Sequence, residues 1–478
     1  MGRTGAPSQS ALYQLYLQRD PKHDGRFLTG VLSTGIYCLP SCPARRPLPQ
    51  NLQFFKTQDE AVRFGLRPCL RCHPDWFYRG EAWQEALFER TAAMVRLEPG
   101  AFPDVRSLAR AAGVGGARLN ELFRVHAQES PEAFLRRVRV AHVRSLLACG
   151  ASPADAASLA GFAGSVAFFR QFAQLTGLTP EAYAELGSSP SFELRLPANY
   201  AARAVLAFHG RDPEGVCERV QETTITKCVA GGLLRLRLDN LSARCEFEGL
   251  DAHAAHGIAV RMLGLGQDAV GFERQFADDA LLGPLVQRQA GLRIPLSATP
   301  WEGLAWAIVG QQIGLGFAVS LRRRLIQLAG DRHVSGQCSH PGPVAVARLE
   351  VSDLKQLQFS KSKAEYLLEA ARTLAAGELD LDNLRNLSAR RAARTLSSLR
   401  GIGPWTVDYV FLRGLGFPDS LPSGDAGIAQ GLERLIGSRP GEKEIRELAT
   451  RYSPWRSLAA AHIWASLQTG KPEAAKPA

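Results

Sequence analysis

The sequence predicts a multidomain α+β protein, and three observations support this class. The chain has 478 residues, which corresponds to about three domains of ordinary size. Two close cysteine pairs lie near the N-terminus, in "GIYCLPSC" and "RPCLRC". Beyond them, segments with the period of amphipathic helices give way to alternating, strand-like segments, and helical patterns then return.

The composition favours a polyanionic partner. The formal net charge is +11, the pI is about 9.4, and arginine outnumbers lysine. Guanidinium groups match phosphate oxygens, so nucleic acid is the first candidate and a membrane surface the second. No run approaches the roughly 18 apolar residues of a membrane span, and the first residues lack a signal-like apolar segment. We therefore expect a soluble cytoplasmic protein, whose nine cysteines serve metal or thiolate chemistry rather than disulfides.

The two cysteine pairs predict one zinc site. Cys38 and Cys42 form the first pair, and Cys69 and Cys72 form the second. Four thiolates in two pairs complete a tetrahedral shell, with Zn–S distances of about 2.3 Å. A purely structural zinc ribbon is one interpretation. The other is a reactive cluster, because four thiolates around Zn²⁺ keep a net charge of about −2 and stay nucleophilic.

"STGIYCLPSCPARRPLPQNLQFF" followed by "EAVRFGLRPCLRCHPD" resembles the zinc domain of the Ada family, which repairs methyl phosphotriesters in DNA. The resemblance covers about residues 10–78. It implies that Cys38 accepts a methyl group while it stays a zinc ligand, and that Cys42, Cys69 and Cys72 complete the site. Methylation would remove one negative charge and strengthen binding to the phosphate backbone, which is the physical basis of a damage-triggered switch.

Two helix-turn-helix units are expected between about residues 81 and 186. "FPDVRSLARAAGVGGARLNELFRVH" reads as helix, turn, helix, with the turn at Gly113. In "SPADAASLAGFAGSVAFFRQFAQLTGLTPEAY", Pro153 suits a first helical turn and Gly161 a break. The residues expected to pack in the cores of these units are Ala109, Ala112, Phe168, Phe169 and Phe172. An ordinary helical spacer is the alternative.

The second of these segments is similar to the DNA-binding region of AraC-type regulators, and the resemblance covers both units. It implies that the later helix of each unit, near 117–125 and 165–174, enters the major groove of DNA. Arg118, Arg124 and Arg170 would then reach phosphates or bases.

A domain boundary is expected at "ELGSSPSFELRLP", where glycine, serine and proline interrupt the helical pattern. Strand signals follow in "SFELRLP", "TTITKCVAG" and "LLRLRLD", with a helix in "NYAARAVLAFHGRD". Cys217, Cys228 and Cys245 lack the spacing of metal ligands and are interpreted as packing residues.

"LRGIGPWTVDYVFLRGLG", residues 399–416, predicts a tight turn between two helices. Backbone N–H groups at Gly401, Ile402 and Gly403 can hold a DNA phosphate, and both glycines are expected in conformations that a side chain disfavours. A simple helix cap is the alternative. With "IVGQQIGLGFAVSL" and "LPSGDAGI", this stretch resembles the helix-hairpin-helix DNA glycosylases, and "DDALLGPLVQRQAGLRIPLSATPWEGLAWAIVGQQI" narrows the resemblance to the AlkA type, 3-methyladenine DNA glycosylase II, over about residues 191–470.

The resemblance assigns roles to particular residues. Asp425 matches the catalytic aspartate, although it also suits a helix N-cap, and Asp408 and Asp419 are its competitors. A carboxylate there stabilises the positive charge that develops on the sugar during hydrolysis. Gln312 matches the residue that fills the gap left by a flipped nucleotide, where some members have leucine. The matches to positions that line the base pocket are Trp405, Tyr409 and Trp464, of which Trp464 could equally be a core residue.

Electron-rich rings attract cationic alkylated bases by about 0.5 to 2 kcal/mol. Related bifunctional enzymes carry a lysine at the position of Trp405, so we expect a monofunctional hydrolase that leaves an abasic site. We also expect zinc as the one tightly bound metal and no iron–sulfur cluster, because only Cys338 follows residue 250. No "PCHRV"-like acceptor motif is present, so O6-alkylguanine repair is not expected.

The resemblances imply a fusion. Its parts are a small four-cysteine zinc domain, an all-α AraC-type double helix-turn-helix, an α/β N-terminal glycosylase subdomain and an all-α helix-hairpin-helix glycosylase core. The expected bounds are residues 1–80, 81–188, 189–295 and 296–470, with a flexible tail at 471–478.

The expected function is DNA alkylation repair, in which purines of the 3-methyladenine and 7-methylguanine type are flipped out and excised. It is coupled to a methyl-phosphotriester acceptor and a sequence-specific regulator. The alternative is a damage-responsive transcriptional activator whose glycosylase half only binds DNA. The expected partners are double-stranded DNA, including a promoter, and RNA polymerase. We expect a monomer associated with the nucleoid and not with a membrane.

Overall fold

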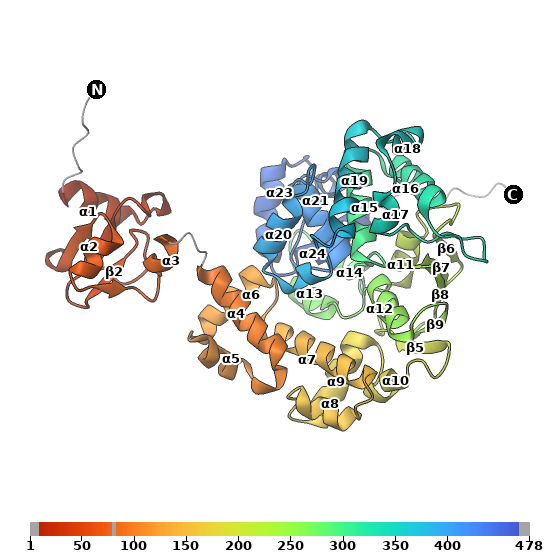
Figure 1. Ribbon diagram of the computed structural model, residues 1–478, viewed down its shortest axis with the longest axis horizontal. Coiled ribbons are helices and arrows are strands. Elements are labelled where there is room, and N and C mark those ends of the chain that lie inside the picture. Colours follow the sequence, from red (N-terminus) through yellow and green to blue (C-terminus); the bar gives the residue numbers. More distant parts are fainter. Residues whose placement is uncertain (1–8, 79–82, 468–478) are drawn as a thin grey trace. The chain divides into compact units, whose positions relative to one another are not determined.

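The computed structural model describes residues 9–78 and 83–467 (Figure 1). The chain divides into two compact units, Met1–Arg90 and Thr91–Ala478. Among the described residues, no helix combines the length and the apolar composition that crossing a lipid bilayer requires. The tail expected at 471–478 lies outside the described residues. The multidomain α+β class is confirmed.

The N-terminal unit is built on a small four-stranded sheet of order β3-β1-β2-β4. Strand β1 pairs antiparallel with β2 and β3, whereas β4 pairs parallel with β2. Because Tyr37 of β2 lies opposite Pro68 of β4, the two cysteine pairs lie at the ends of neighbouring strands. The elements are α1 (Gln9–Gln18), β1 (Leu28–Val31), β2 (Ile36–Cys38), β3 (Leu52–Phe55), α2 (Gln58–Arg63), β4 (Arg67–Pro68) and α3 (Pro74–Tyr78).

Helix α4 (Trp83–Leu97) spans the division between the units, and two helix-turn-helix pairs follow it. In the first pair Asp104 caps α5, which ends at Gly113 with φ 70°, as the sequence predicts. In the second pair Phe168 and Phe172 are buried. Phe169 is 38% exposed, so its assignment to the core was wrong: it lies on the solvent side of its helix. The helices are α5 (Val105–Ala112), α6 (Gly116–His126), α7 (Pro131–Ala148), α8 (Pro153–Leu159), α9 (Ser165–Thr176) and α10 (Pro180–Ala184).

An antiparallel five-stranded sheet of order β5-β9-β8-β7-β6 comes next. Strands β5, β7 and β8 match the three predicted segments, whereas β6 and β9 were not predicted. Cys217, Cys228 and Cys245 are fully buried, which confirms them as packing residues. The elements are β5 (Ser191–Arg195), α11 (Ala202–His209), β6 (Glu218–Gln221), β7 (Thr224–Val229), β8 (Gly232–Leu238), β9 (Ser242–Glu248) and α12 (Ala252–Met262).

The second helix-turn-helix pair and this sheet share one hydrophobic core. Phe172 and Tyr183 pack in the same cluster as Leu194 and Leu236. The backbone N–H of Arg195 donates to the carbonyl of Gly177 at 2.8 Å, across the segment where the sequence changes character. This part of the chain is therefore packed together rather than joined by a free linker.

The C-terminal half is helical and has two apolar clusters. Helices α15, α16, α19, α20 and α21 bury the first cluster, while α13, α14, α22, α23 and α24 bury the second. The helices are α13 (Ala269–Phe276), α14 (Gly283–Arg288), α15 (Pro300–Gly310), α16 (Leu315–Ala329), α17 (Pro343–Ala347), α18 (Val351–Gln356), α19 (Lys361–Ala375), α20 (Ala389–Ser397), α21 (Pro404–Tyr409), α22 (Ala426–Ile436), α23 (Glu442–Ala449) and α24 (Arg456–Ser466), with a π-helix, η5 (Val410–Leu415).

Candidate functional site

Asp425 lies at the start of α22, where residues from both clusters converge. Its Oδ1 accepts the backbone N–H of Ile428 at 3.0 Å, so it is the N-cap of the helix. Two indole N–H groups also donate to the carboxylate, from Trp464 to Oδ1 at 2.9 Å and from Trp405 to Oδ2 at 3.1 Å. These bonds fix the plane of a carboxylate that remains partly open to solvent.

Two glycines on α22 allow Trp464 to reach this carboxylate. A Cβ at Gly427 would lie 3.2 Å from the Trp464 ring, and a Cβ at Gly431 would lie 2.4 Å from Ile463. Helix α24 can therefore approach α22 closely. Neither glycine was singled out from the sequence, although their spacing of one helical turn in "DAGIAQG" is a usable signal.

The predicted pocket residues form one aromatic cluster beside Asp425. Trp405 and Tyr409 are stacked with ring centroids 5.4 Å apart, and Trp464 lies 6.2 Å from Tyr409. The Tyr409 hydroxyl accepts the indole N–H of Trp306 at 2.8 Å. All four rings are partly exposed, so they offer aromatic surface next to a fixed carboxylate. Trp306 was missed by the sequence argument.

The competing aspartates have different surroundings. Asp419 accepts two N–H groups of the Arg456 side chain at 2.8 and 2.9 Å and the Ser453 hydroxyl at 2.8 Å, so it is committed to a buried ion pair. Burial raises the pKa of Asp408 to about 7, although Arg456 and Arg446 oppose the shift. Neither shares the indole contacts of Asp425.

Asp408 predicts a pH-dependent stability. Its folded pKa lies above the unfolded value of 3.8, so the fold prefers the protonated acid and loses stability as pH rises from about 4 to about 7. Asp408→Asn should therefore have a free energy of unfolding about 2 kcal/mol higher than that of the wild type at pH 8, measured by urea unfolding. This difference should vanish near pH 4. A difference that is constant between these pH values would contradict this assignment.

The hairpin between α20 and α21 is tight at its first glycine. Gly401 has φ 80°, and a Cβ there would lie 2.2 Å from the Tyr366 ring. Gly403 has φ −92°, which any residue adopts, so the expectation of a disfavoured conformation was wrong for Gly403. A Cβ built at Gly403 would have no heavy atom within 4 Å other than those of Gly403 and its two chain neighbours, which leaves room for a ligand to approach the backbone. The backbone N–H of Ile402 donates to the carbonyl of Leu399.

The loop after α15 is tied to this hairpin. The Gln311 side chain donates to the carbonyl of Gly401 at 2.9 Å and to the hydroxyl of Thr406 at 3.0 Å. Gln312 is exposed and has φ 55°, a left-handed conformation that is uncommon for a residue with a side chain. The structure therefore presents Gln312 outward beside the hairpin. Gln311 was missed, although it stands next to Gln312 in "GQQI".

Two arginines contact rings of the aromatic cluster. Arg211 is 4.7 Å from the ring centroid of Trp306, and Arg413 is 5.4 Å from that of Trp464. Both arginines also contact the ring of Phe208, at 3.9 and 4.4 Å. Burial lowers the pKa of Arg413 to about 10, within the range where it stays charged at neutral pH. These contacts hold the aromatic rings in place.

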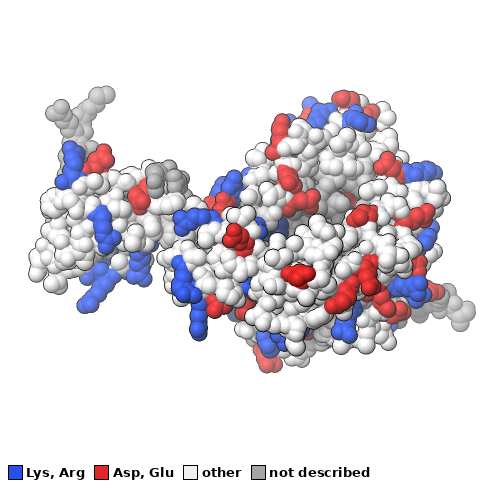
Figure 2. Space-filling model, turned by 60° about the horizontal axis from the view of Figure 1, so that its bottom comes forward, with Lys and Arg blue, Asp and Glu red and all other residues white. Residues whose placement is uncertain are grey.

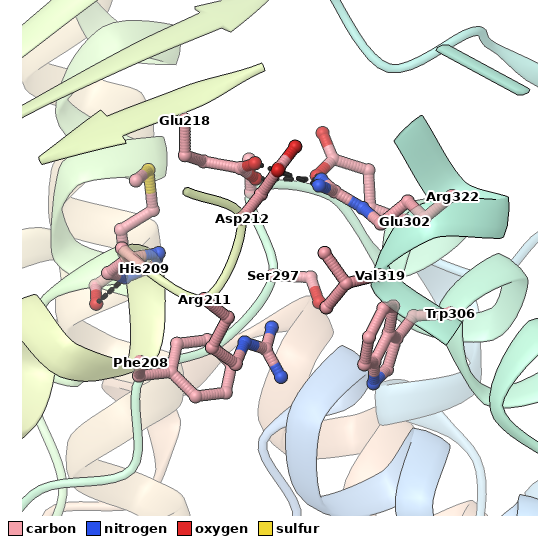
Figure 3. A pocket seen from close by; sticks show the side chains of 12 residues that line it. Phe208, His209, Arg211, Asp212, Glu218, Ser297, Glu302, Trp306, Val319 and Arg322 are labelled. Carbon is pink, nitrogen blue, oxygen red and sulfur yellow. Dashed lines mark hydrogen bonds and ion pairs between the residues drawn. The ribbon is translucent and has the colours of Figure 1, made fainter. Parts of the chain in front are cut away.

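A narrow cavity beside Arg211 is lined by Glu218, Glu302 and Arg322 (Figure 3). The buried ammonium of Lys227 lies 2.9 Å from Glu218 and 2.8 Å from Glu302, so the charges there compensate one another. The cavity has a volume of about 30 Å³, enough for about one water molecule. It is too small for a nucleobase, and the aromatic cluster remains the candidate base site.

The four predicted zinc ligands are brought together. The sulfur atoms of Cys38, Cys42, Cys69 and Cys72 all lie within 4.8 Å of one another, and the four side chains are buried. A tetrahedron with Zn–S bonds of about 2.3 Å fits this spacing. Figure 2 shows lysine and arginine side chains on the visible face of the N-terminal unit, where acidic side chains are few.

The sulfur atoms differ in their hydrogen bonds. Backbone N–H groups donate to Cys72 from Leu39 and to Cys69 from Arg71, both at 3.4 Å, and the Ala44 N–H favours the thiolate of Cys42.

The predicted major-groove helices coincide with α6 and α9. Arg124 on α6 and Arg170 on α9 are exposed. Arg118 is half-buried and forms an ion pair with Glu121 on the same helix. The structure therefore presents at least one exposed arginine on each of these helices.

Comparison with known proteins gives three matching family models. Residues 11–75 match the metal binding domain of Ada, residues 108–185 match a helix-turn-helix domain, and residues 305–454 match the HhH-GPD superfamily of base excision DNA repair proteins. These matches confirm the three resemblances seen in the sequence.

Two curated relatives illustrate the likeness. This chain is 28% identical to the probable bifunctional transcriptional activator/DNA repair enzyme AlkA of Mycobacterium tuberculosis, over 95% of this chain and 96% of the relative. Over 42% of this chain and 68% of the relative, it is 32% identical to the DNA-3-methyladenine glycosylase of Bacillus subtilis. Among solved structures, a 3-methyladenine DNA glycosylase from Archaeoglobus fulgidus matches in fold with TM-score 0.53 and 22% identity, covering 58% of this chain and 98% of that one.

Proposed function

Because the chain belongs to the DNA-3-methyladenine glycosylase family, we propose that its C-terminal half hydrolyses the N-glycosidic bond of alkylated purines in DNA. The observation that carries this proposal is the carboxylate of Asp425, held by two indole N–H groups beside the stacked rings of Trp405 and Tyr409. An oriented carboxylate next to an aromatic surface suits a cationic sugar and a flipped base.

Asp425 acts on the sugar in this mechanism. As the bond from C1′ to the base nitrogen breaks, its electron pair leaves with the base and positive charge develops on the sugar. A carboxylate about 4 Å away stabilises that charge by roughly 4 kcal/mol at an effective dielectric of about 20. Water then adds to C1′ and loses a proton, which gives an abasic site.

The hairpin and the loop after α15 would hold the DNA. The backbone near Gly403 is open to a phosphate, and Gln312 projects outward where it can fill the gap left by the flipped nucleotide. Trp405 occupies the position where a lysine would form a Schiff base, so the product strand should remain uncut. A gel assay that shows strand cleavage without alkali or heat would contradict this part.

Trp464→Phe tests the positioning of Asp425. This change keeps an aromatic side chain but replaces the indole with a smaller ring that has no N–H, so one hydrogen bond to the carboxylate is lost, a contact to a charged group of about 1.5–3 kcal/mol. We expect the single-turnover rate of base release to fall by about tenfold or more. Trp306→Phe, which removes the N–H that bonds to Tyr409 instead, should lower it less. Equal losses in the two variants would exclude a specific role for Trp464.

We also propose that the cysteine cluster binds one zinc ion and that Cys38 accepts a methyl group from a phosphotriester. Bound zinc keeps the four thiolates deprotonated. The Cys38 sulfur attacks the methyl carbon, so an S–C bond forms, the C–O bond breaks, and the electron pair stays on the phosphate oxygen. Mass spectrometry after exposure to methylated DNA should find one added methyl group on the Cys38 peptide. An unchanged mass would favour a structural zinc site.

The two helix-turn-helix units complete the proposal. We assign α6 and α9 to major grooves of a promoter, with Arg118, Arg124 and Arg170 contacting phosphates or bases. RNA polymerase is the partner expected of such an activator.

A further inference from the structure

The first helix-turn-helix unit contacts the glycosylase core through hydrogen bonds and an ion pair. The loop after α6 places Glu129 between two arginines, with Arg137 at 2.7 Å and Arg385 of the core at 3.6 Å. Arg385 also donates to the carbonyl of Ala127, and the side chain of Gln128 accepts the backbone N–H of Asp419 at 3.2 Å. These partly buried contacts fix the position of α6 relative to the core.

This junction places α6 next to the first helix of the hairpin. Helix α6 contacts α20, and the two lie side by side in Figure 1. Helix α20 has nine residues, so it is about 13 Å long, and the hairpin glycine Gly401 follows shortly after its end. One turn of B-form DNA measures about 34 Å. The distance from α6 to the hairpin is therefore on the order of half a turn of duplex.

The surface between them is basic. Helix α20, "ARRAARTLS", buries Ala389, Ala392 and Leu396 and contains no acidic residue. Its exposed arginines are Arg390, Arg391 and Arg394, of which Arg391 and Arg394 also interact with other groups. Arg400 is exposed in the hairpin, where it forms an ion pair with Glu365 at 3.4 Å. Arg124 is exposed on α6, which contacts α20. Exposed arginines are therefore present on α6, on α20 and in the hairpin.

We propose that α6 and the hairpin form one DNA-binding surface, so that the first helix-turn-helix unit and the glycosylase hold the same duplex at the same time. This inference rests on the proposed function. The helix-turn-helix unit then acts as part of the repair enzyme, because it binds the DNA on one side of the damaged base while the glycosylase binds at the base itself. A promoter and a damaged duplex exclude each other on a single chain.

Single-turnover base release tests the proposal, with the full chain in excess over a duplex that carries one alkylated purine. Arg124→Gln removes a charge from α6. We expect the protein concentration for half-maximal rate to rise by about threefold to tenfold. The slope of log affinity against log salt should become shallower by about 0.9 for one lost phosphate contact. Arg235→Gln, an exposed arginine on β8, makes the same charge change elsewhere and should leave both values at the wild-type level.

The length of the duplex gives a second readout. Shortening the DNA on one side of the damaged base from about 12 to about 3 base pairs should raise the half-maximal concentration for the wild type, because about 3 base pairs span only roughly 10 Å, less than the length of α20. Shortening the other side should have a smaller effect. Arg124→Gln should lose this asymmetry.

The outcomes separate the two claims. A wild type that releases no base at any concentration overturns the proposed function itself. Normal wild-type release, with half-maximal concentration, salt slope and flank dependence all unchanged in Arg124→Gln, overturns the shared surface alone. Matching thermal unfolding of the variant and the wild type would show that the exposed substitution leaves the fold intact.

Discussion

Asp425→Asn is expected to lower the rate of base release by at least about 10³-fold while the fold and DNA binding survive. Asparagine caps a helix about as well as aspartate, so α22 keeps its N-cap. The amide oxygen can still accept one of the N–H groups that now bind the carboxylate. What disappears is the negative charge that stabilises the cationic sugar.

Asp408→Asn is the matched control for this loss. It makes the same chemical change on α21, in a side chain without the indole contacts of Asp425. Rates of both variants should be measured under single-turnover conditions, together with the affinity for damaged duplex. A loss with Asp408→Asn that matches or exceeds the loss with Asp425→Asn would move the catalytic role to Asp408.

Removal of zinc is expected to unfold the N-terminal unit and to leave the rest of the chain folded. Structural zinc contributes about 10–16 kcal/mol in small domains, and this unit has only a short four-stranded sheet and a small core around the four cysteines. The remainder, Thr91–Ala478, has its own cores and forms a separate compact unit.

Proteolysis with and without a chelator measures this effect. Chelation should expose sites in residues 9–78 and leave the C-terminal half protected and active in base release. Cys69→Ser should cause the same exposure without a chelator, whereas Cys149→Ser, an exposed cysteine outside the cluster, should not. An N-terminal unit that resists protease equally with and without metal would show that zinc is not part of its fold.

The local features of the fold could be predicted because short-range chemistry determines them. Gly113 ends a helix with positive φ, and Asp425 begins one as its cap. The cysteine pairs cluster because their spacing allows the chain to fold back. In contrast, β6 has only four residues, ERVQ, with one apolar side chain, and it owes its place to β7. The polar and apolar residues of β9, SARCEFE, do alternate, and this signal was missed.

The long-range contacts of the site could not be predicted from the sequence. Trp464 and Trp405 donate to opposite oxygens of Asp425 from positions 39 and 20 residues away, so their convergence depends on how three helices pack. The hydrogen bond from the Gln311 side chain to the carbonyl of Gly401 joins residues that are 90 positions apart in the sequence. Phe169 resembles its buried neighbours in type, and only the packing of α9 leaves it exposed.

Chromatography of free bases, after the purified chain is incubated with methylated duplex DNA, tests the central claim most directly. The wild type should release methylated purines, and Asp425→Asn should release none above the spontaneous background. Absence of release by the wild type, or equal release by the variant, would contradict the account of Asp425 as the carboxylate that drives hydrolysis.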